Sequence, residues 1–199
     1  MNSRPVLFLS ATILLAGIIF LSLRSAQAAG ECPRGLIPSS RSCPGDGIEA
    51  EEARLAQGVN QYRAQNRLPQ ISLSGSLTLV ANRHVRDLAE NIGYLTHGWS
   101  DCPYDPHDEN TWHCMWKAPQ RLRTAYPGKG YENAHFSGDG KATANSAFEG
   151  WKRSSAHKEV ILSQGKWKTH QWKALGVGIY KGFAVLWFGV EPDPSGPPP

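Results

Sequence analysis

The stretch ALGVGIYKGFAVLWFGV, residues 174–190, decides the fold class of this chain. Two runs rich in β-branched and aromatic residues flank Lys181-Gly182, a pair that suits a tight turn, so the stretch predicts a β-hairpin. The predicted strands cover residues 174–180 and 183–190. In the first strand Gly176 and Gly178 alternate with branched apolar residues. Small residues on one face indicate that another element packs closely against it.

Four segments upstream of the hairpin have the apolar spacing of helices. The first begins near Ile48, carries acidic residues in its first turn and ends at Arg67-Leu68-Pro69. Ser74 is the expected N-cap of the second, which Gly93 ends. Shorter helical stretches are predicted over 143–151 and 155–162, and a third strand over 131–136. Helices followed by strands indicate an α+β domain with helices on both faces of a small antiparallel sheet.

The first 28 residues have the features of a secretory signal peptide. A basic start that includes Arg4 precedes an apolar run over 6–23, and Ala26-Gln27-Ala28 follows at cleavage distance. We therefore expect a secreted, extracytoplasmic mature protein without a stable membrane span. The apolar run approaches the ~20 residues that cross a bilayer, so an uncleaved anchor helix is the alternative.

The remainder of the chain divides into three predicted parts. Residues 29–47 are rich in Pro, Gly and Ser and form an irregular extension. Residues 48–191 form the folded domain. Residues 192–199 contain five prolines, which fit neither helix nor strand, so this tail is expected to fray.

The four cysteines lie outside the leader and are even in number, which in an exported protein predicts disulfides. Of the three possible pairings, the local one joins Cys32–Cys43 and Cys102–Cys114 and closes two short loops. Zinc is the rival interpretation, but the chain lacks the C-x-x-C pair typical of structural zinc sites.

Charge and motifs exclude several classes of function. The net charge of +4 falls to +2 when Arg4 and Arg24 leave with the leader, which is too balanced for a dedicated nucleic-acid partner. G-x-G-x-x-G, G-x-x-x-x-G-K-[ST], H-E-x-x-H and G-x-S-x-G are all absent from the sequence.

Histidines are the remaining candidates for chemistry. His84 lies on the apolar stripe of the second helix, where a hydrogen-bonded core histidine is the expectation. His107 and His113 bracket two acids inside the predicted Cys102–Cys114 loop, which suits either a polar surface loop or a metal clip. His170 lies among lysines and tryptophans, a pattern that forms the edge of a core or binds glycans or lipid head groups.

The order of the remaining motifs resembles the CAP superfamily, which groups cysteine-rich secretory proteins, antigen 5 and plant pathogenesis-related 1 proteins. The resemblance covers about residues 48–189. Its motifs are Asn60-Gln61-Tyr62-Arg63 with Leu68-Pro69, the helix 77–88, Gly130-Tyr131-Glu132-Asn133, Trp151-x-x-Ser154-x-x-His157 with Ile161-Leu162, Gly176-Val177-Gly178-Ile179, and Trp187-Phe188-Gly189.

The resemblance implies an αβα sandwich whose cleft is lined by two histidines and two glutamates. By motif match His97, Glu132 and His157 take three of these places, and Ser154 stands at the fourth. Two histidines and a carboxylate are the ligand set of some zinc sites, so zinc or another divalent metal is a candidate cofactor. The same groups also form a self-contained hydrogen-bonded cluster.

Family members have several activities, so the sequence favours a class of function rather than one reaction. We expect a secreted binding or interaction module, whose partner is an extracellular protein or a lipid or sterol-like ligand. This favours a protein that is not an enzyme, and no catalytic residue is assigned. The alternatives are a metal-assisted hydrolase that uses the same cleft and a structural envelope protein.

Overall fold

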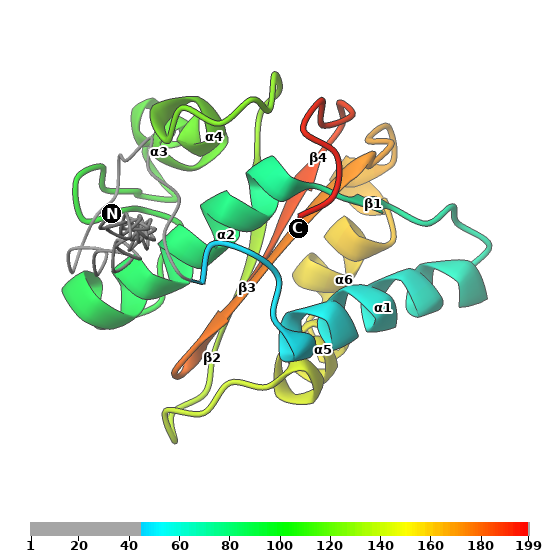
Figure 1. The fold of residues 1–199 in the computed structure, drawn as a ribbon, viewed down its shortest axis with the longest axis horizontal. Coiled ribbons are helices and arrows are strands. Elements are labelled where there is room, and N and C mark those ends of the chain that lie inside the picture. Colours follow the sequence, from blue (N-terminus) through cyan, green and yellow to red (C-terminus); the bar gives the residue numbers. More distant parts are fainter. Residues whose placement is uncertain (1–44, 199) are drawn as a thin grey trace, which may run out of the picture. The chain divides into compact units, whose positions relative to one another are not determined.

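A computed structural model describes residues 45–198, in which helices enclose one sheet of strand order β1-β3-β4-β2 (Figure 1). Strands β3 (Ala174–Tyr180) and β4 (Phe183–Gly189) form the predicted hairpin, and β2 (Tyr131–Phe136) pairs antiparallel with β4. The sheet is not wholly antiparallel as expected, because β1 (Ser72–Leu73) pairs parallel with β3. A strand of two residues is too short to show an alternating pattern.

The four predicted helical segments are present. They are α1 (Ala50–Gln65), α2 (Gly75–Asp87), α5 (Ala144–Arg153) and α6 (Ser155–Ile161). The Ser74 side chain accepts a hydrogen bond from the Leu77 N–H at 2.9 Å, which confirms the expected N-cap. After α2 a π-turn over Leu88–Ile92 ends at Gly93, whose φ of 82° is left-handed.

Several short elements were not predicted. Helices α3 (His113–Trp116) and α4 (Ala118–Arg121) fill the segment between α2 and β2, and 3₁₀ turns cover Glu109–Thr111 and Gly165–Trp167. Four residues make about one helical turn, so no apolar periodicity can build up in the sequence.

Two apolar cores lie on opposite faces of the sheet. Successive side chains of β4 point to opposite faces of the sheet. Val185 and Trp187 pack with α2, whereas Leu186 and Phe188 pack with α1, α5 and α6. The glycine face of β3 lets α2 approach, because a Cβ on Gly176 would lie 2.2 Å from the Leu77 backbone. This close seating, which the glycines predicted, fixes α2 against the sheet.

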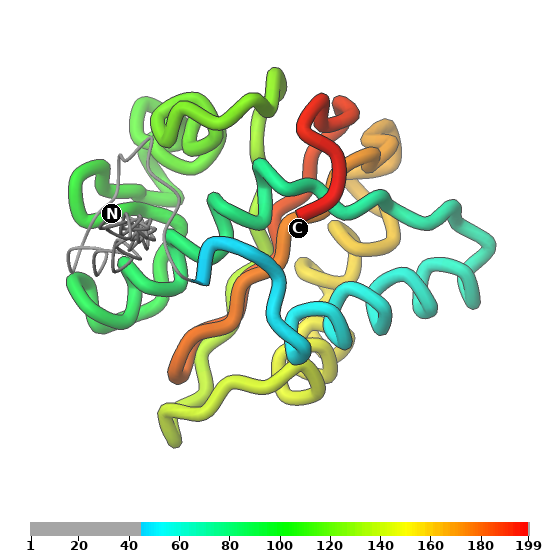
Figure 2. The backbone as a smooth tube through the Cα atoms, viewed as in Figure 1, coloured from blue at the N-terminus to red at the C-terminus, as the bar shows by residue number. Residues whose placement is uncertain are grey.

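The C-terminal tail does not fray as expected, because it is bound to the start of α2 (Figure 2). The Asp193 carboxylate accepts hydrogen bonds from the Ser74 hydroxyl at 2.6 Å and the Ser76 N–H at 2.9 Å. The Gly75 N–H donates to the Gly196 carbonyl at 2.7 Å. Prolines exclude regular structure here, but they do not prevent capping of a neighbouring helix.

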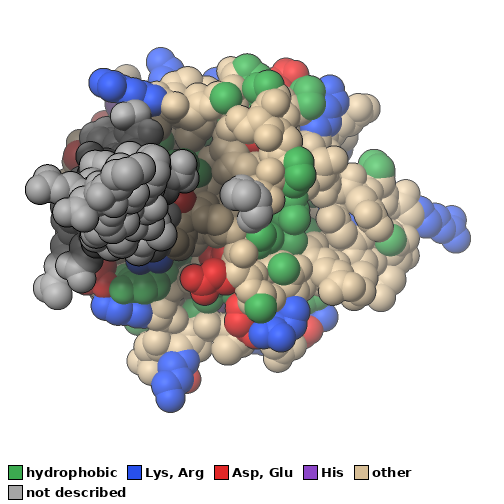
Figure 3. Space-filling view, in the orientation of Figure 1, with side chains coloured by type: hydrophobic (Ala, Val, Ile, Leu, Met, Phe, Trp, Pro, Cys, Tyr) green, Lys and Arg blue, Asp and Glu red, His purple; other side chains and the backbone are tan. Residues whose placement is uncertain are grey.

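Residues 1–28 and the predicted Cys32–Cys43 disulfide lie outside the described residues. The helices within residues 45–198 include none that could span a bilayer. On the face seen in Figure 3, Lys and Arg side chains are scattered around the rim, with acidic side chains between them.

Candidate functional site

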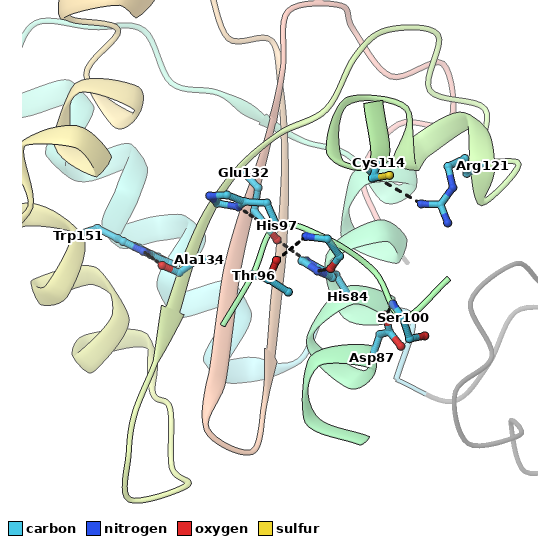
Figure 4. Close-up of polar contacts among 11 residues, drawn as sticks. His84, Asp87, Thr96, His97, Ser100, Cys114, Arg121, Glu132, Ala134 and Trp151 are labelled. Carbon is cyan, nitrogen blue, oxygen red and sulfur yellow. Dashed lines mark hydrogen bonds and ion pairs between the residues drawn. The ribbon is translucent and has the colours of Figure 1, made fainter. Parts of the chain in front are cut away.

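A buried carboxylate on β2 is the centre of the candidate site. Glu132 lies opposite Trp187 of β4, and its side chain has no exposed surface. Its two oxygens are bound by two histidines: Oε1 lies 2.5 Å from His84 Nδ1, and Oε2 lies 2.6 Å from His97 Nδ1 (Figure 4). The Glu132 carboxylate therefore joins α2, which carries His84, to the segment after α2, which carries His97.

His84 is the fully buried member of this array. Its Nδ1 faces Glu132, and its Nε2 lies 2.9 Å from the carbonyl oxygen of Gly98. A carboxylate and a carbonyl both accept hydrogen bonds, so each ring nitrogen carries a proton and the imidazole is cationic. Burial lowers the pKa of His84, but the charge of Glu132 and its hydrogen bonds outweigh burial and raise it.

The pKa of Glu132 is shifted in the direction opposite to that of His84, and both shifts favour the charged form. Burial alone raises the pKa of a carboxyl group, yet the neighbouring His84 and His97 hold the pKa of Glu132 well below its usual range. His84 and Glu132 thus form a buried ion pair. The prediction that His84 is a hydrogen-bonded core histidine is confirmed.

His97 is the accessible end of the array, with 32% of its side chain exposed. Its segment is fixed on both sides: the Gly98 N–H donates to Thr96 Oγ1 at 3.0 Å, and the Ser100 N–H donates to Asp87 Oδ2 at 2.8 Å (Figure 4). The Tyr104 ring packs edge-on against the imidazole, with centroids 5.3 Å apart. Since Nδ1 donates to Glu132, neutral His97 keeps the lone pair on Nε2 for a ligand or a proton.

His157 lies on α6, the short helix that follows α5. Its carbonyl oxygen accepts a hydrogen bond from Asn133 Nδ2 at 3.0 Å, which ties α6 to β2 beside Glu132. Burial lowers the pKa of His157, repulsion from His97 and His135 lowers it further, and Glu132 opposes them. His97 and Glu132 therefore influence the pKa of this imidazole in opposite directions.

Ser154, which stands at the fourth place of the site that the resemblance implies, bonds to His157. Its Oγ lies 2.8 Å from His157 Nδ1, and within residues 45–198 no hydrogen bond joins it to Glu132. The structure thus joins Glu132 directly to His97 and His84, and Ser154 directly to His157. His84 is the residue that sequence reasoning left out of the site, because a histidine on an apolar stripe does not reveal which acid faces it.

The other candidates lie elsewhere. Cys102 and Cys114 form the predicted disulfide. With His113 they also form a group whose possible ligand atoms lie within 4.8 Å of one another, but the two sulfurs are bonded to each other. His170 packs with Tyr131, Trp167 and Trp172 beside a cavity of about 400 Å³.

Comparisons with known proteins agree with this architecture. Residues 57–181 match the model of the cysteine-rich secretory protein family, CAP. An extracellular SCP-domain protein from Bacillus anthracis str. Ames has a TM-score of 0.55 at 21% identity, over 75% of this chain and 44% of that one. An outer surface protein from Borrelia burgdorferi has a TM-score of 0.50 at 18% identity, over 73% of this chain and 97% of the Borrelia protein.

These likenesses concern the fold. At such identities the two solved structures show a shared architecture of helices and sheet, and the chain spans less than half the length of the Bacillus protein. A comparison with curated proteins gives no match.

Proposed function

Because the chain belongs to the cysteine-rich secretory protein (CAP) family, we propose that it is an extracytoplasmic binding module. Its ligand lies at the edge of β2, between His97 and His157. The observation that carries this proposal is the fixed array behind His97. A buried ion pair of His84 and Glu132 holds one imidazole in a single orientation and leaves it partly accessible. Such preorganisation reduces the entropy lost on binding.

Export of the protein is part of this proposal. The basic start, the apolar run and Ala26-Gln27-Ala28 support a leader that is removed after Ala28. N-terminal sequencing of the exported protein should begin just after that residue. A sequence that still begins at Met1 would make the chain an anchored protein.

The donor set fits a divalent metal through the two imidazoles rather than the carboxylate. With Nδ1 of His97 on Glu132 and Nδ1 of His157 on Ser154, each ring can offer Nε2. A carboxylate that receives the other ring N–H of a histidine is the usual partner behind a zinc ligand. We therefore assign Glu132 an orienting role. A small apolar ligand would instead pack against Tyr104, whose ring borders His97.

A zinc titration monitored by histidine NMR tests the metal. Zinc requires neutral imidazoles, so its affinity should fall as the pH drops through the histidine range. Because burial lowers the pKa of His157, proton competition at that ring starts below its ordinary pH. The combined His97→Ala and His157→Ala changes should abolish binding, and His107→Ala serves as the exposed control. If zinc changes neither the melting temperature nor any histidine titration, His97 and His157 do not bind zinc.

A hydrolase is the second candidate, and one contact favours it. Ser154 Oγ lies 2.8 Å from His157 Nδ1, and the lowered pKa of His157 keeps that ring neutral and able to accept the hydroxyl proton. Release of peptide or ester products that His157→Ala and Ser154→Ala both abolish would establish this activity. Unchanged release in either variant would exclude the pair.

A further inference from the structure

We propose that Cys102, His113 and Cys114 form a metal site that opens on reduction. When a dithiol reductant cleaves the Cys102–Cys114 disulfide, the two thiolates and the His113 imidazole together bind a zinc ion. This site shares no ligand with the proposed site of His97 and His157, and it does not depend on that site's function.

The geometry of the oxidised protein is already close to that of a zinc centre. His113 Nε2 lies 3.8 Å from Cys102 Sγ and 3.7 Å from Cys114 Sγ. With Zn–S near 2.3 Å and Zn–N near 2.0–2.1 Å, a tetrahedral ion places sulfur and nitrogen about 3.6 Å apart. The imidazole therefore needs little movement to serve as a ligand once the sulfurs separate.

The proton arrangement of His113 also suits a ligand. Its Nδ1 lies 2.6 Å from the carbonyl oxygen of Asn110, in the 3₁₀ turn that precedes α3. A carbonyl only accepts hydrogen bonds, so Nδ1 carries the proton and Nε2, the nitrogen nearest the sulfurs, has the lone pair when the ring is neutral. Zinc-bound histidines usually donate their other N–H to a carbonyl or carboxylate in this way.

Other contacts keep the two cysteines close when the disulfide opens. Backbone hydrogen bonds of 2.8 and 3.0 Å join Cys102 to the buried Trp99. Arg121 forms an ion pair with Asp101. Its guanidinium also lies 3.4 Å from the carbonyl oxygen of Cys114, as Figure 4 shows. Arg121 thus links the two ends of the loop without using sulfur.

The chemistry balances with an external dithiol. The disulfide takes two electrons and two protons from the dithiol, which is oxidised to its own disulfide, and Cys102 and Cys114 become thiols. Zinc binding then releases both thiol protons, since only thiolates are ligands. Three protein ligands leave a fourth position for water. The oxidised loop has no thiolate to offer, so the redox state determines whether metal binds.

Cobalt(II) is the probe for this site, because cobalt bound to thiolates absorbs in the near ultraviolet. The full chain is reduced with a phosphine, which adds no competing thiol, and titrated with cobalt and then zinc. We expect one equivalent of cobalt to give the thiolate band in the reduced protein, zinc to bleach it, and the oxidised protein to give none. Cobalt held by His97 and His157 would give no such band.

Three variants make the assignment specific. His113→Ala should weaken cobalt binding by more than about tenfold, the lower end of what even an outer-shell change costs. His107→Ala, an exposed histidine of the same loop, should leave binding unchanged. The double variant Cys102→Ser and Cys114→Ser keeps Cys32 and Cys43 and should lose the band. No band in the reduced protein, undiminished affinity in His113→Ala, or a full band in the double variant would overturn the proposal.

Discussion

Glu132 is the residue on which the candidate site depends. Its side chain is buried between two histidines, and one of them, His84, has no exposed side-chain surface. A buried charge is tolerated only when a partner compensates it, so Glu132 and His84 must be considered together. Each holds the other in its charged form.

Replacing Glu132 with Gln should therefore destabilise the protein. The amide leaves the His84 cation without its counter-charge in a buried position, and such a loss lowers the free energy of unfolding by about 3–5 kcal/mol. Urea unfolding at pH 7 measures the change. Glu149→Gln, at a partly exposed i,i+3 pair with Lys152, is the control and should change stability by less than about 1 kcal/mol. Equal effects of the two substitutions would show that the Glu132–His84 charges are not coupled.

At the scale of elements, the seating of α2 on β3 determines where His84 lies. Gly176 and Gly178 leave no side chain between the strand and the helix, and a Cβ on Gly178 would lie 2.6 Å from the Ala81 backbone. Since His84 is one turn beyond Ala81, the same approach brings its ring to Glu132.

Gly176→Ala should push α2 away from the sheet. The new methyl group would overlap the Leu77 backbone, which cannot rotate away as a side chain could. We expect a loss of about 3 kcal/mol or more, at the upper end for overpacked cores. Gly138→Ala is the matched control, because nothing lies within 4 Å of its added Cβ. Comparable melting temperatures for the two variants would refute this account of the contact.

A second buried carboxyl, on α1, gives stability a pH dependence. Burial raises the pKa of Glu52 to about 7, although the N–H groups of Glu49 and Ile179 donate to it. This pKa exceeds the unfolded value near 4.3, so folding takes up a proton between the two values and stability falls as the pH rises toward 7.

Through the titration of Glu52, the free energy of unfolding of the wild type should fall by about 1–2 kcal/mol between pH 5.5 and 7.5. In Glu52→Gln the free energy of unfolding should fall by that much less between the two pH values, whatever the absolute stability of the variant. Chemical denaturation at both pH values gives the comparison. Parallel pH profiles for wild type and variant would mean that Glu52 does not titrate in this range.

At the scale of the molecule, the C-terminal tail binds the start of α2 and so supports the element that carries His84. Asp193→Ala removes the acceptor for the Ser74 hydroxyl and the Ser76 N–H. Loss of such a cap should lower the free energy of unfolding by about 1–2 kcal/mol, measured by thermal unfolding. A melting temperature equal to that of the wild type would show that the tail contributes nothing.

Long periodic patterns explain what the sequence could predict. The hairpin, α2 and the glycine face were read from alternation, helical spacing and Ser74, and all are present in the structure. Strand β1 and helices α3 and α4 were not predicted, because they are too short to show a periodic pattern. The bonds from Ser74 and Ser76 to Asp193 link residues more than 100 positions apart, and local patterns contain no information about such contacts.

The candidate site was predictable only in part for a similar reason. His97, Glu132 and His157 were assigned by motif match, and the motifs around Glu132 and His157 have recognisable local sequences. His84 lacks such a motif, and its role arises because α2 packs on β3 and β4 and turns this ring toward Glu132. Its ring packs against Trp99 and Trp187, with centroid distances of 4.5 and 5.9 Å, and its carboxylate partner is Glu132, so its neighbours come from three separate segments.

Native mass spectrometry of the exported protein tests the central claim, that the array of His84, Glu132 and His97 beside His157 forms a binding site. We expect a mass that begins after Ala28 and carries a bound metal ion or small apolar molecule, either as isolated or after addition of zinc. The variant with His97→Ala and His157→Ala should have the same chain mass without the adduct. A wild-type protein that carries no adduct under either condition, or an adduct that persists in the variant, would contradict the account.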